Sequence, residues 1–324
     1  MLDESDDMRD HRDHDHCDTV MRIARRNPSE RCDTADAVPT EFFATPGDER
    51  SAVSESVPPT SLERAPADVG AGTGNLRTFV TTVVATTEIT PILRRITFGG
   101  GLDDFVSLGA DQFVYVLLPP RGRSELTIGT DFTWEAARAM AESEQPTGAY
   151  YTVRSWRPDV GEIDAWFVLH GDAGDASAWA TSAEPGDTAA LWGPRTAFEP
   201  PPPTGSYLLV VDETGYAAAA AILDAVLATS PTTPVTVLAE CDTSPVTDLL
   251  AAGGNVEVRC CRRYGAEPGT SSVLLDAVRS IDVSGDVYAY GAAESKRITE
   301  MRRHLRDVCG LTSEQVSMTG SWRR

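Results

Sequence analysis

Three side chains near position 150 could together serve a flat, phosphate-bearing cofactor. Tyr151, Thr152 and Arg154 offer a phenol, a hydroxyl and a guanidinium in one short segment of strand-forming residues. The later segment Gly174–Trp179 has the pattern of a glycine-led turn into a helix, with Ser177 near its start. The first amides of a helix attract anions such as phosphate. In this order the two segments predict a flavin site, whereas each alone is typical of a plain strand or a helix N-cap.

Two neighbouring positions leave alternatives open. Thr152 and Arg154 are two residues apart, so on one strand both would project from the same face and suit a flavin contact. A solvated arginine at the strand edge is the rival interpretation. His170 ends a predicted strand, and Gly171 allows the backbone to turn close to a ligand. For His170, a structural imidazole and a flavin contact are both consistent with the sequence.

Acidic residues follow two apolar strands in the second half of the chain. Asp212, Glu213 and Thr214 come directly after one strand, and Gly291–Glu294 follows another. Where parallel strands alternate with helices, ligands bind in the crevice beyond the carboxyl ends of the strands. Both segments are therefore predicted to face a nicotinamide nucleotide, although Glu294 is also placed to cap the next helix. The absence of G-x-G-x-x-G favours a reductase-type nucleotide domain over a dinucleotide Rossmann fold.

The elements that must position these residues change in character along the chain. Up to about residue 200, β-branched and aromatic segments separated by Gly or Pro predict a small antiparallel barrel, with a helical or irregular insertion at 132–144. After the proline run 200–203, alternating strands and helices predict a doubly wound parallel sheet. The predicted strands are 78–84, 92–98, 112–118, 149–154, 163–169, 188–191, 206–212, 234–239, 255–261, 287–290 and 315–318, and the predicted helices of the second half are 216–228, 246–252, 271–281 and 294–308.

The first 75 residues differ in composition from the rest. They mix acids, Ser, Thr, Pro and Gly without apolar periodicity, which predicts a disordered acidic extension. The histidine- and aspartate-rich segment 11–17 has ligand types suited to zinc or iron, but a solvated tail is the favoured interpretation, and no metal site is predicted. The expected organisation is an extension at 1–75, a flavin-binding β-barrel domain at 76–200 and an NAD(P)H-binding α/β domain at 204–324.

The composition excludes several classes of protein. A formal net charge of −21 argues against nucleic acid or an anionic membrane as partner, since such a field repels polyphosphate. No apolar run approaches the roughly 18 residues of a membrane helix, so no integral membrane association is expected. Acids rather than bases open the chain, which argues against a signal peptide and for a cytoplasmic location. The six cysteines include no C-x-x-C pair, so neither an iron–sulfur cluster nor a zinc site is supported.

Beyond the segment around Tyr151, further blocks follow the order found in one known family. With them, the chain from about Arg77 to its C-terminal end resembles the siderophore-interacting protein family, the flavin-dependent ferric-siderophore reductases related to ferredoxin-NADP reductases. The blocks are Thr90–Thr97, Gly109–Val114, Pro185–Asp187, Gly193–Pro194, Asp212–Thr214, Gly291–Glu294 and Thr319–Arg323.

The resemblance implies a chemistry and a set of site residues. It implies FAD as cofactor, NAD(P)H as electron donor with reduced ferredoxin as an alternative, and a ferric siderophore as substrate. It places the Tyr151 hydroxyl near the ribityl chain and Thr152 near the ring nitrogen that accepts hydride, so these two are the candidate catalytic residues. The candidate cofactor-binding residues are Tyr151, Thr152, Val153, Arg154, His170, Gly171, Ala176, Ser177, Asp212, Glu213, Thr214, Gly291, Glu294 and Trp322, and the candidate substrate-binding residues are Arg323 and Arg324.

Three positions depart from the family pattern. Ala149 stands where an arginine is usual, Asp175 where a proline is usual, and Val211 where a glycine is usual. A lost charge-assisted contact to phosphate weakens binding by about 1.5–3 kcal/mol. The departures therefore motivate an alternative hypothesis, a non-catalytic siderophore- or flavin-binding module of the same fold with weakened FAD binding. A general flavin or ferredoxin-type reductase is a third and weaker hypothesis, because it depends on kinship of fold alone.

Overall fold

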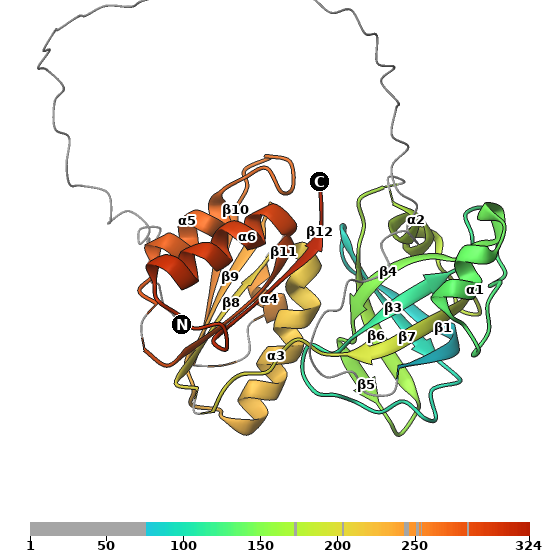
Figure 1. The fold of residues 1–324 in the computed structure, drawn as a ribbon, viewed down its shortest axis with the longest axis horizontal. Coiled ribbons are helices and arrows are strands. Elements are labelled where there is room, and N and C mark those ends of the chain that lie inside the picture. The colour runs from blue at the N-terminus through green and yellow to red at the C-terminus, as the bar shows by residue number, and fades with distance from the viewer. Residues whose placement is uncertain are drawn as a thin grey trace, which may run out of the picture. The chain divides into compact units, whose positions relative to one another are not determined.

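The computed structural model of the protein describes residues 76–171, 174–202, 204–242, 246–250, 253, 255–283 and 285–324. All of them belong to one compact unit, Val57–Arg324 (Figure 1). The predicted disordered extension at 1–75, with its histidine-rich segment, lies outside the described residues.

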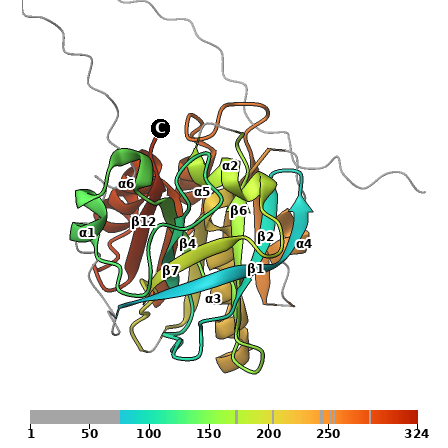
Figure 2. The ribbon, with the colours of Figure 1, turned by 90° about the vertical axis from the view of Figure 1, so that its right-hand side faces the viewer.

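The first half of the described chain is an antiparallel, curled seven-stranded sheet, which confirms the predicted fold of this half (Figure 2). Its strands follow the order β4-β3-β7-β1-β2-β6-β5. The predicted insertion contains a short helix whose first turn is capped by the Thr133 side chain. The elements are β1 (Arg77–Thr90), β2 (Leu93–Gly99), β3 (Phe113–Leu118), α1 (Trp134–Ala139), a 3-10 turn (Glu142–Glu144), β4 (Thr147–Thr152), β5 (Ser155–Arg157), β6 (Glu162–Val168), α2 (Asp175–Ser182) and β7 (Thr188–Arg195).

Strand alternation gives this sheet two apolar faces. Along β3, Val114 and Val116 enter the barrel core, whereas Tyr115 and Leu117 enter a second cluster on the opposite face. This follows from the two-residue period of a strand. The second cluster also contains the aromatic side chains of Trp134 and other residues from the insertion and from β4 and β7. Both faces of β3 are therefore buried.

The second half is a five-stranded parallel sheet in the order β10-β9-β8-β11-β12, which confirms the predicted doubly wound fold. The helices α3 and α4 cover one face, and α5 and α6 cover the other (Figure 1). The strand order reverses between β8 and β11, so the switch point lies between these two strands. The elements are β8 (Ser206–Val211), a 3-10 turn (Glu213–Gly215), α3 (Tyr216–Thr229), β9 (Val235–Cys241), α4 (Val246–Leu250), β10 (Val256–Arg262), α5 (Val273–Ser280), β11 (Val287–Glu294), α6 (Ser295–Arg303), a π-helical turn (His304–Val308) and β12 (Val316–Trp322).

The last two strands extend further than the sequence pattern predicted. Gly291, expected in a loop, and Glu294, expected at the start of the next helix, both belong to β11, and Trp322 ends β12. Gly291 pairs with Val210 on one side and Met318 on the other, and a Cβ atom there would meet the Met318 sulfur. The glycine therefore permits close strand packing inside the sheet.

The two sheets share buried contacts. Leu93 of β2 is 2% exposed and packs in one core cluster with Leu209 and Tyr216 of the parallel half. Asp111, before β3, is 3% exposed with a left-handed backbone (φ 56°), and Tyr290 of β11 donates a hydrogen bond to its carboxylate. Burial raises the pKa of Asp111 from 3.8 to about 7, and the Tyr290 hydrogen bond only partly opposes this.

Because the folded protein holds a proton on Asp111 that the unfolded chain releases, we expect the free energy of unfolding to fall as the pH rises through the range 3.8 to about 7. The neutral variant Asp111→Asn should not show this loss. The difference in free energy of unfolding between the variant and the parent should therefore shift in favour of the variant by about 1–3 kcal/mol when the pH is raised from 5 to 8. Urea unfolding followed by circular dichroism at both pH values measures the difference. Asp103→Asn, at an exposed position of the same half, is the control. A parent and an Asp111→Asn variant with parallel pH profiles would contradict the prediction.

Candidate functional site

One carboxylate joins three segments at the switch point of the parallel sheet. Asp212 directly follows β8 and is 5% exposed. Its Oδ1 accepts hydrogen bonds from the Thr214 amide at 2.9 Å and the Thr214 hydroxyl at 2.5 Å. Its Oδ2 accepts from the Glu294 amide at 3.0 Å and from Trp322 Nε1 at 2.8 Å. Burial raises the pKa of Asp212, whereas these four donors lower it. The carboxylate therefore fixes the chain after β8, at the end of β11 and at the end of β12.

Glu294 is the cap of the helix that follows β11. Its Oε2 accepts hydrogen bonds from the amides of Lys296 at 2.8 Å and Arg297 at 3.0 Å. Of the two roles that the sequence left open, the structure shows the capping role. Trp322 lies beside it, since a Cβ atom on Gly269 would be 3.0 Å from both the Trp322 ring and Glu294. Contact with nicotinamide stays a prediction for both residues.

A buried ion cluster lies beyond the carboxyl ends of β8, β9 and β10. Arg263 Nη1 is 2.6 Å and 2.8 Å from the two carboxylate oxygens of Glu213 and 3.2 Å from Glu240 Oε1. The three side chains are each less than a tenth exposed. Burial raises the pKa of Glu240 to about 7, with Arg263 opposing and Asp212 and Glu213 adding to the rise. Two carboxylates thus share one guanidinium.

The sequence analysis missed Glu240 and Arg263. Glu240 directly follows the predicted strand 234–239, and Arg263 comes two residues after the predicted strand 255–261. The carboxyl ends of neighbouring parallel strands lie at the same edge of the sheet. An acidic and a basic residue at two such ends could therefore have indicated an ion pair at this edge.

On the antiparallel half, Tyr151 and Thr152 point to opposite faces of β4. Tyr151 pairs with Val114 and packs against the barrel core, with its ring centroid 3.9 Å from that of Phe167. Burial raises the pKa of the Tyr151 phenol above its ordinary value. Thr152 pairs with Phe113 on the other face. The phenol and the hydroxyl therefore serve different sides of the strand.

Arg154 does not lie on the same strand as Thr152, contrary to the prediction, because β4 ends at Thr152. Its amide donates to the Asp164 carbonyl at 2.8 Å, which turns the chain toward β5. Its Nη1 forms an ion pair with Asp224 of α3 at 2.7 Å, and its guanidinium lies 5.3 Å from the Trp166 ring centroid. The buried Nε has no hydrogen-bond partner among the described residues.

Ser177 fastens a turn. Its Oγ accepts a hydrogen bond from the His170 amide and donates one to the Gly171 carbonyl, both at 2.9 Å. The N-cap of α2 is Gly174, so Ser177 lies in the first turn of the helix and does not take the N-cap role that the sequence left open as an alternative. The first helical bond runs from the Ala178 amide to the Gly174 carbonyl. The amides of 175–177 precede this bond and so lie outside the helical ladder, and first-turn amides of this kind bind anions.

His170 and Ala176 lie at this same turn. The His170 side chain is exposed, and a Cβ atom on Gly174 would lie 2.9 Å from its ring. Ala176 packs against the barrel core with Trp179, and Val153 is buried in the same core. For these residues a cofactor contact stays a prediction.

Arg195 is a buried cation that the sequence analysis did not single out. It ends β7, is 8% exposed, and lies with its guanidinium 4.8 Å from the Trp192 ring centroid. Strand pairing aligns Thr152 with Phe113 and Phe113 with Arg195, so these three share one row. Arg195 has no carboxylate partner among the described residues, and its Nε has no hydrogen-bond partner there. Its position directly after Gly193–Pro194 could have drawn attention to it.

A second polar group beside Arg195 also lacks a partner. The buried Tyr150 hydroxyl has no hydrogen-bond partner among the described residues, and the Arg195 charge lowers the Tyr150 pKa against the stronger effect of burial. Buried polar groups are normally satisfied. Two donors without a partner in the described ranges, on Tyr150 and Arg195, suit an acceptor-rich anionic group. The residues present therefore fit a flavin nucleotide near Thr152.

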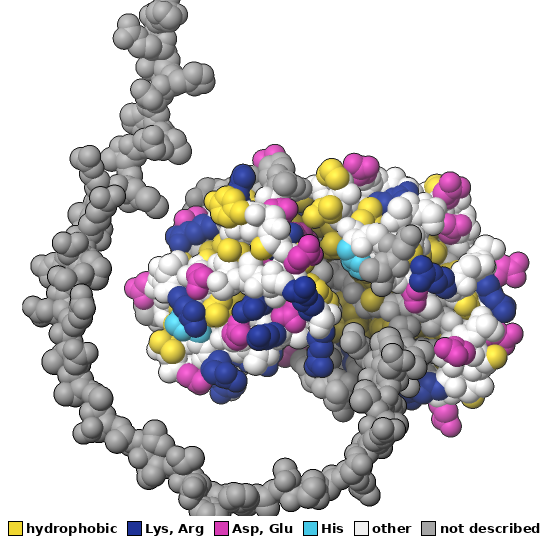
Figure 3. Space-filling view, turned by 90° about the horizontal axis from the view of Figure 1, so that it is seen from above, with side chains coloured by type: hydrophobic (Ala, Val, Ile, Leu, Met, Phe, Trp, Pro, Cys, Tyr) yellow, Lys and Arg dark blue, Asp and Glu magenta, His cyan; other side chains and the backbone are white. Residues whose placement is uncertain are grey.

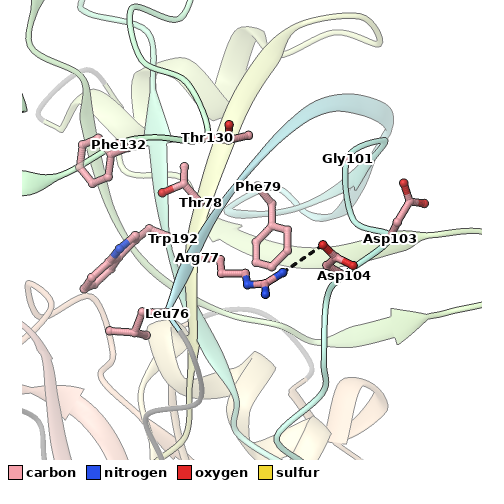
Figure 4. Close-up of a pocket in the computed structure, with 10 residues that line it drawn as sticks. All are labelled: Leu76, Arg77, Thr78, Phe79, Gly101, Asp103, Asp104, Thr130, Phe132 and Trp192. Atoms are coloured by element: carbon pink, nitrogen blue, oxygen red, sulfur yellow. Dashed lines mark hydrogen bonds and ion pairs between the residues drawn. The ribbon is translucent and has the colours of Figure 1, made fainter.

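A cavity of about 390 Å³ lies elsewhere on the antiparallel half (Figure 4). Phe79 and Trp192 line it, and an ion pair of 3.0 Å joins Arg77 to Asp104 at its side. None of the predicted site residues lines it. The cavity therefore does not mark the predicted flavin site.

The face seen from above carries basic and acidic side chains among one another (Figure 3). Arg323 and Arg324, the predicted substrate-binding residues, are exposed at the C-terminal end of the chain. Within the described ranges, no group of three or more His, Cys, Asp or Glu side chains is arranged to hold a metal ion. A search of the same ranges found no helix with the length and apolar character needed to cross a membrane.

Comparison with protein families gives two adjoining matches. A model described as a siderophore-interacting FAD-binding domain matches residues 82–198. A model described as siderophore-interacting protein matches residues 204–324. The first match covers the antiparallel half, and the second covers the parallel half.

Individual relatives are similar to the chain over different lengths. A siderophore utilization protein from T. fusca is 27% identical with a TM-score of 0.68, over 78% of this chain and 95% of that chain. The mycobactin import ATP-binding/permease protein IrtA of Mycolicibacterium smegmatis is 31% identical over 176 residues, which are 53% of this chain and 19% of the transporter. A ferredoxin NADP⁺ reductase from Neisseria gonorrhoeae with bound FAD and NADP is 16% identical over 76% of this chain and 98% of that chain, with a TM-score of 0.53, which shows likeness of fold alone.

Asp212→Asn should destabilise the protein, because all four groups around the carboxylate are donors and an amide nitrogen cannot accept from them. We expect a loss of about 2–4 kcal/mol in the free energy of unfolding, and about 1 kcal/mol for Trp322→Phe, which removes one donor. Urea unfolding of both single variants and of the double variant measures the coupling. Additive losses in the double variant would show that Trp322 does not depend on Asp212.

Proposed function

Since this chain belongs to the siderophore-interacting protein family, we propose that it is an FAD-dependent reductase that passes electrons from NAD(P)H to a ferric siderophore and so releases iron. The observation that carries the proposal is the row Thr152–Phe113–Arg195, which ends in a buried guanidinium that has no carboxylate partner in the described part of the chain. A buried cation normally has a counter-charge. A buried arginine without a counter-charge among the described residues therefore supports an anionic ligand at this place.

FAD, when bound, would accept electrons as a hydride and deliver them singly to iron. Tyr151, Thr152 and the first-turn amides of α2 would hold it. The Thr152 hydroxyl would donate or accept a hydrogen bond at the reacting edge, and the α2 amides would meet the pyrophosphate. Trp322, held by Asp212 at 2.8 Å, would shield the site from water. Ferrous iron binds hard oxygen ligands more weakly than ferric iron does, so the reduced iron would dissociate from the siderophore.

The arginines would divide the anionic groups among themselves. Arg195, which shares a row with Thr152, would meet the charge of the cofactor or of the substrate, and the exposed Arg323 and Arg324 would attract an anionic siderophore. Reduced ferredoxin is the alternative donor in this proposal. We propose a cytoplasmic location, since both the nicotinamide donor and the use of the released iron belong there.

One observation favours the alternative of a binding module without turnover. The Tyr151 ring is stacked on Phe167 inside the barrel core, so the phenol is not presented on the same face as Thr152. Against this, the added carboxylate of Asp175 lies 3.8 Å from Arg121 Nη1. That ion pair reduces the repulsion that Asp175 would exert on a pyrophosphate.

Ala149→Arg should tighten FAD binding about tenfold or more, since a charge-assisted contact to phosphate contributes about 1.5–3 kcal/mol. Ala149→Met, of similar length and without charge, is the matched control. Quenching of flavin fluorescence on titration with protein gives the dissociation constants. An unchanged constant for Ala149→Arg would show that another group already neutralises the phosphate.

The holo-protein should reduce a ferric siderophore anaerobically with NADH or NADPH, as measured by trapping ferrous iron with a chelator. Thr152→Ala should slow flavin reduction about tenfold or more, because a group beside the hydride acceptor is lost. Arg323→Ala should chiefly raise the Michaelis constant for the siderophore, because it weakens capture of an anion. If no nicotinamide nucleotide and no reduced ferredoxin reduces the bound flavin, the binding-module alternative replaces the reductase.

A further inference from the structure

An aromatic side chain stands exposed beside the carboxyl ends of β9 and β10. Tyr264, in the loop after β10, is 86% exposed and has a left-handed backbone (φ 53°). A large non-glycine residue in this conformation is uncommon and needs support from its surroundings. No contact in the proposed reductase chemistry uses it.

The loop around Tyr264 is fixed on both sides. The Gly265 amide donates to Asp242 Oδ1 at 2.9 Å, and the Ala266 amide donates to the Arg263 carbonyl at 3.2 Å. Arg263 itself is anchored inward by Glu213 and Glu240. The aromatic ring is therefore held outward by a braced loop, which suits a platform for a flat ring.

Three acidic residues lie next to this platform. Glu240 lies near the end of β9, and Asp242 directly follows that strand. Glu213 lies in the turn after β8 and is paired with Arg263. The one guanidinium that points inward, that of Arg263, is shared by two carboxylates. Arg262, the last residue of β10, is an exposed cation on this edge.

We infer that this edge binds the adenosine half of the electron donor, with adenine on Tyr264 and its ribose beside Asp242, and that it selects NADH over NADPH. The inference rests on the proposed function, because it assumes a nicotinamide donor. Ligands of doubly wound sheets bind beyond the carboxyl ends of the strands at the switch point. A carboxylate at this edge can accept a hydrogen bond from a free ribose 2′-hydroxyl. A 2′-phosphate would instead meet carboxylates, and juxtaposed like charges are strongly unfavourable.

Arg262 provides the rival outcome. If its guanidinium held a 2′-phosphate, NADPH would be the preferred donor despite the acids. Arg262→Ala would then abolish that preference, whereas our inference expects the variant to leave NADH binding essentially unchanged.

Calorimetric titration of the full-length protein with NAD⁺ and NADP⁺ tests the inference without turnover. We expect NAD⁺ to bind about tenfold more tightly or better. Asp242→Asn, which keeps an acceptor for the Gly265 amide, should strengthen NADP⁺ binding several-fold and leave NAD⁺ binding nearly unchanged. Glu314→Gln removes the same charge at an exposed position before β12, on the opposite edge of the sheet, and should change neither constant.

Tyr264→Ser is a second variant. Because the Tyr264 side chain is exposed, we expect this variant to fold like the parent protein. Loss of base stacking should weaken both nucleotides about tenfold. Equal or tighter binding of NADP⁺ to the parent protein would overturn the selectivity, and unchanged binding by Tyr264→Ser would overturn the placement of adenine. Absence of binding by either nucleotide would overturn both.

A separate measurement distinguishes these failures from failure of the proposed function. Protein loaded with FAD and reduced by dithionite is mixed anaerobically with ferric siderophore, and ferrous iron is trapped. Release of iron there, together with failed nucleotide selectivity, would leave the reductase proposal standing and reject this inference alone.

Discussion

Four donors from three segments converge on the carboxylate of Asp212, and the geometry of the whole switch point depends on this convergence. The residue is 5% exposed, so water cannot replace a missing partner at low cost. The carboxylate binds its own loop through Thr214, the end of β11 through Glu294 and the end of β12 through Trp322. It thereby sets the boundary at which the parallel sheet stops and its binding edge begins.

Charge is distributed in opposite ways on the two halves of the described chain. On the antiparallel half, Arg195 is buried without a carboxylate partner in the described ranges. On the parallel half, Arg263 is buried between Glu213 and Glu240, and ion pairs with these carboxylates neutralise its charge inside the protein. The first arrangement leaves a buried positive charge without a counter-charge in the described ranges, and the second pairs its positive charge with two carboxylates. The net charge of −21 therefore says little about either place, because local geometry decides the potential that a ligand meets.

The departures from the family pattern take on different weights in three dimensions. The Asp175 carboxylate forms an ion pair with Arg121 at 3.8 Å. Ala149 is not directly replaced, since it pairs with Val116 whereas Arg195 pairs with Phe113, three residues away along β3. A cation is thus available on the sheet, but on a different row from the one that the missing arginine would have occupied. This is why FAD affinity, rather than fold, is the property most exposed to these substitutions.

The sequence by itself determined the two-part architecture, because alternation of period two, apolar strand runs and turn residues are local properties that survive burial. The order of its motif blocks, by resemblance, indicated the family. It also singled out Asp212, Thr214, Glu294 and Trp322, which hydrogen bonds join in the structure. Only the tertiary structure decided what their side chains do. Glu294 turned out to cap α6, and Arg154 joined Asp224, which is 70 residues away in the chain. The hydroxyl of Ser177 hydrogen-bonds to the backbone of His170 and Gly171. Arg263 is paired with two carboxylates, whereas Arg195 has no carboxylate partner among the described residues. Hydrogen bonds and ion pairs depend on partners distant in sequence, and no local periodicity encodes which partner a polar side chain will meet.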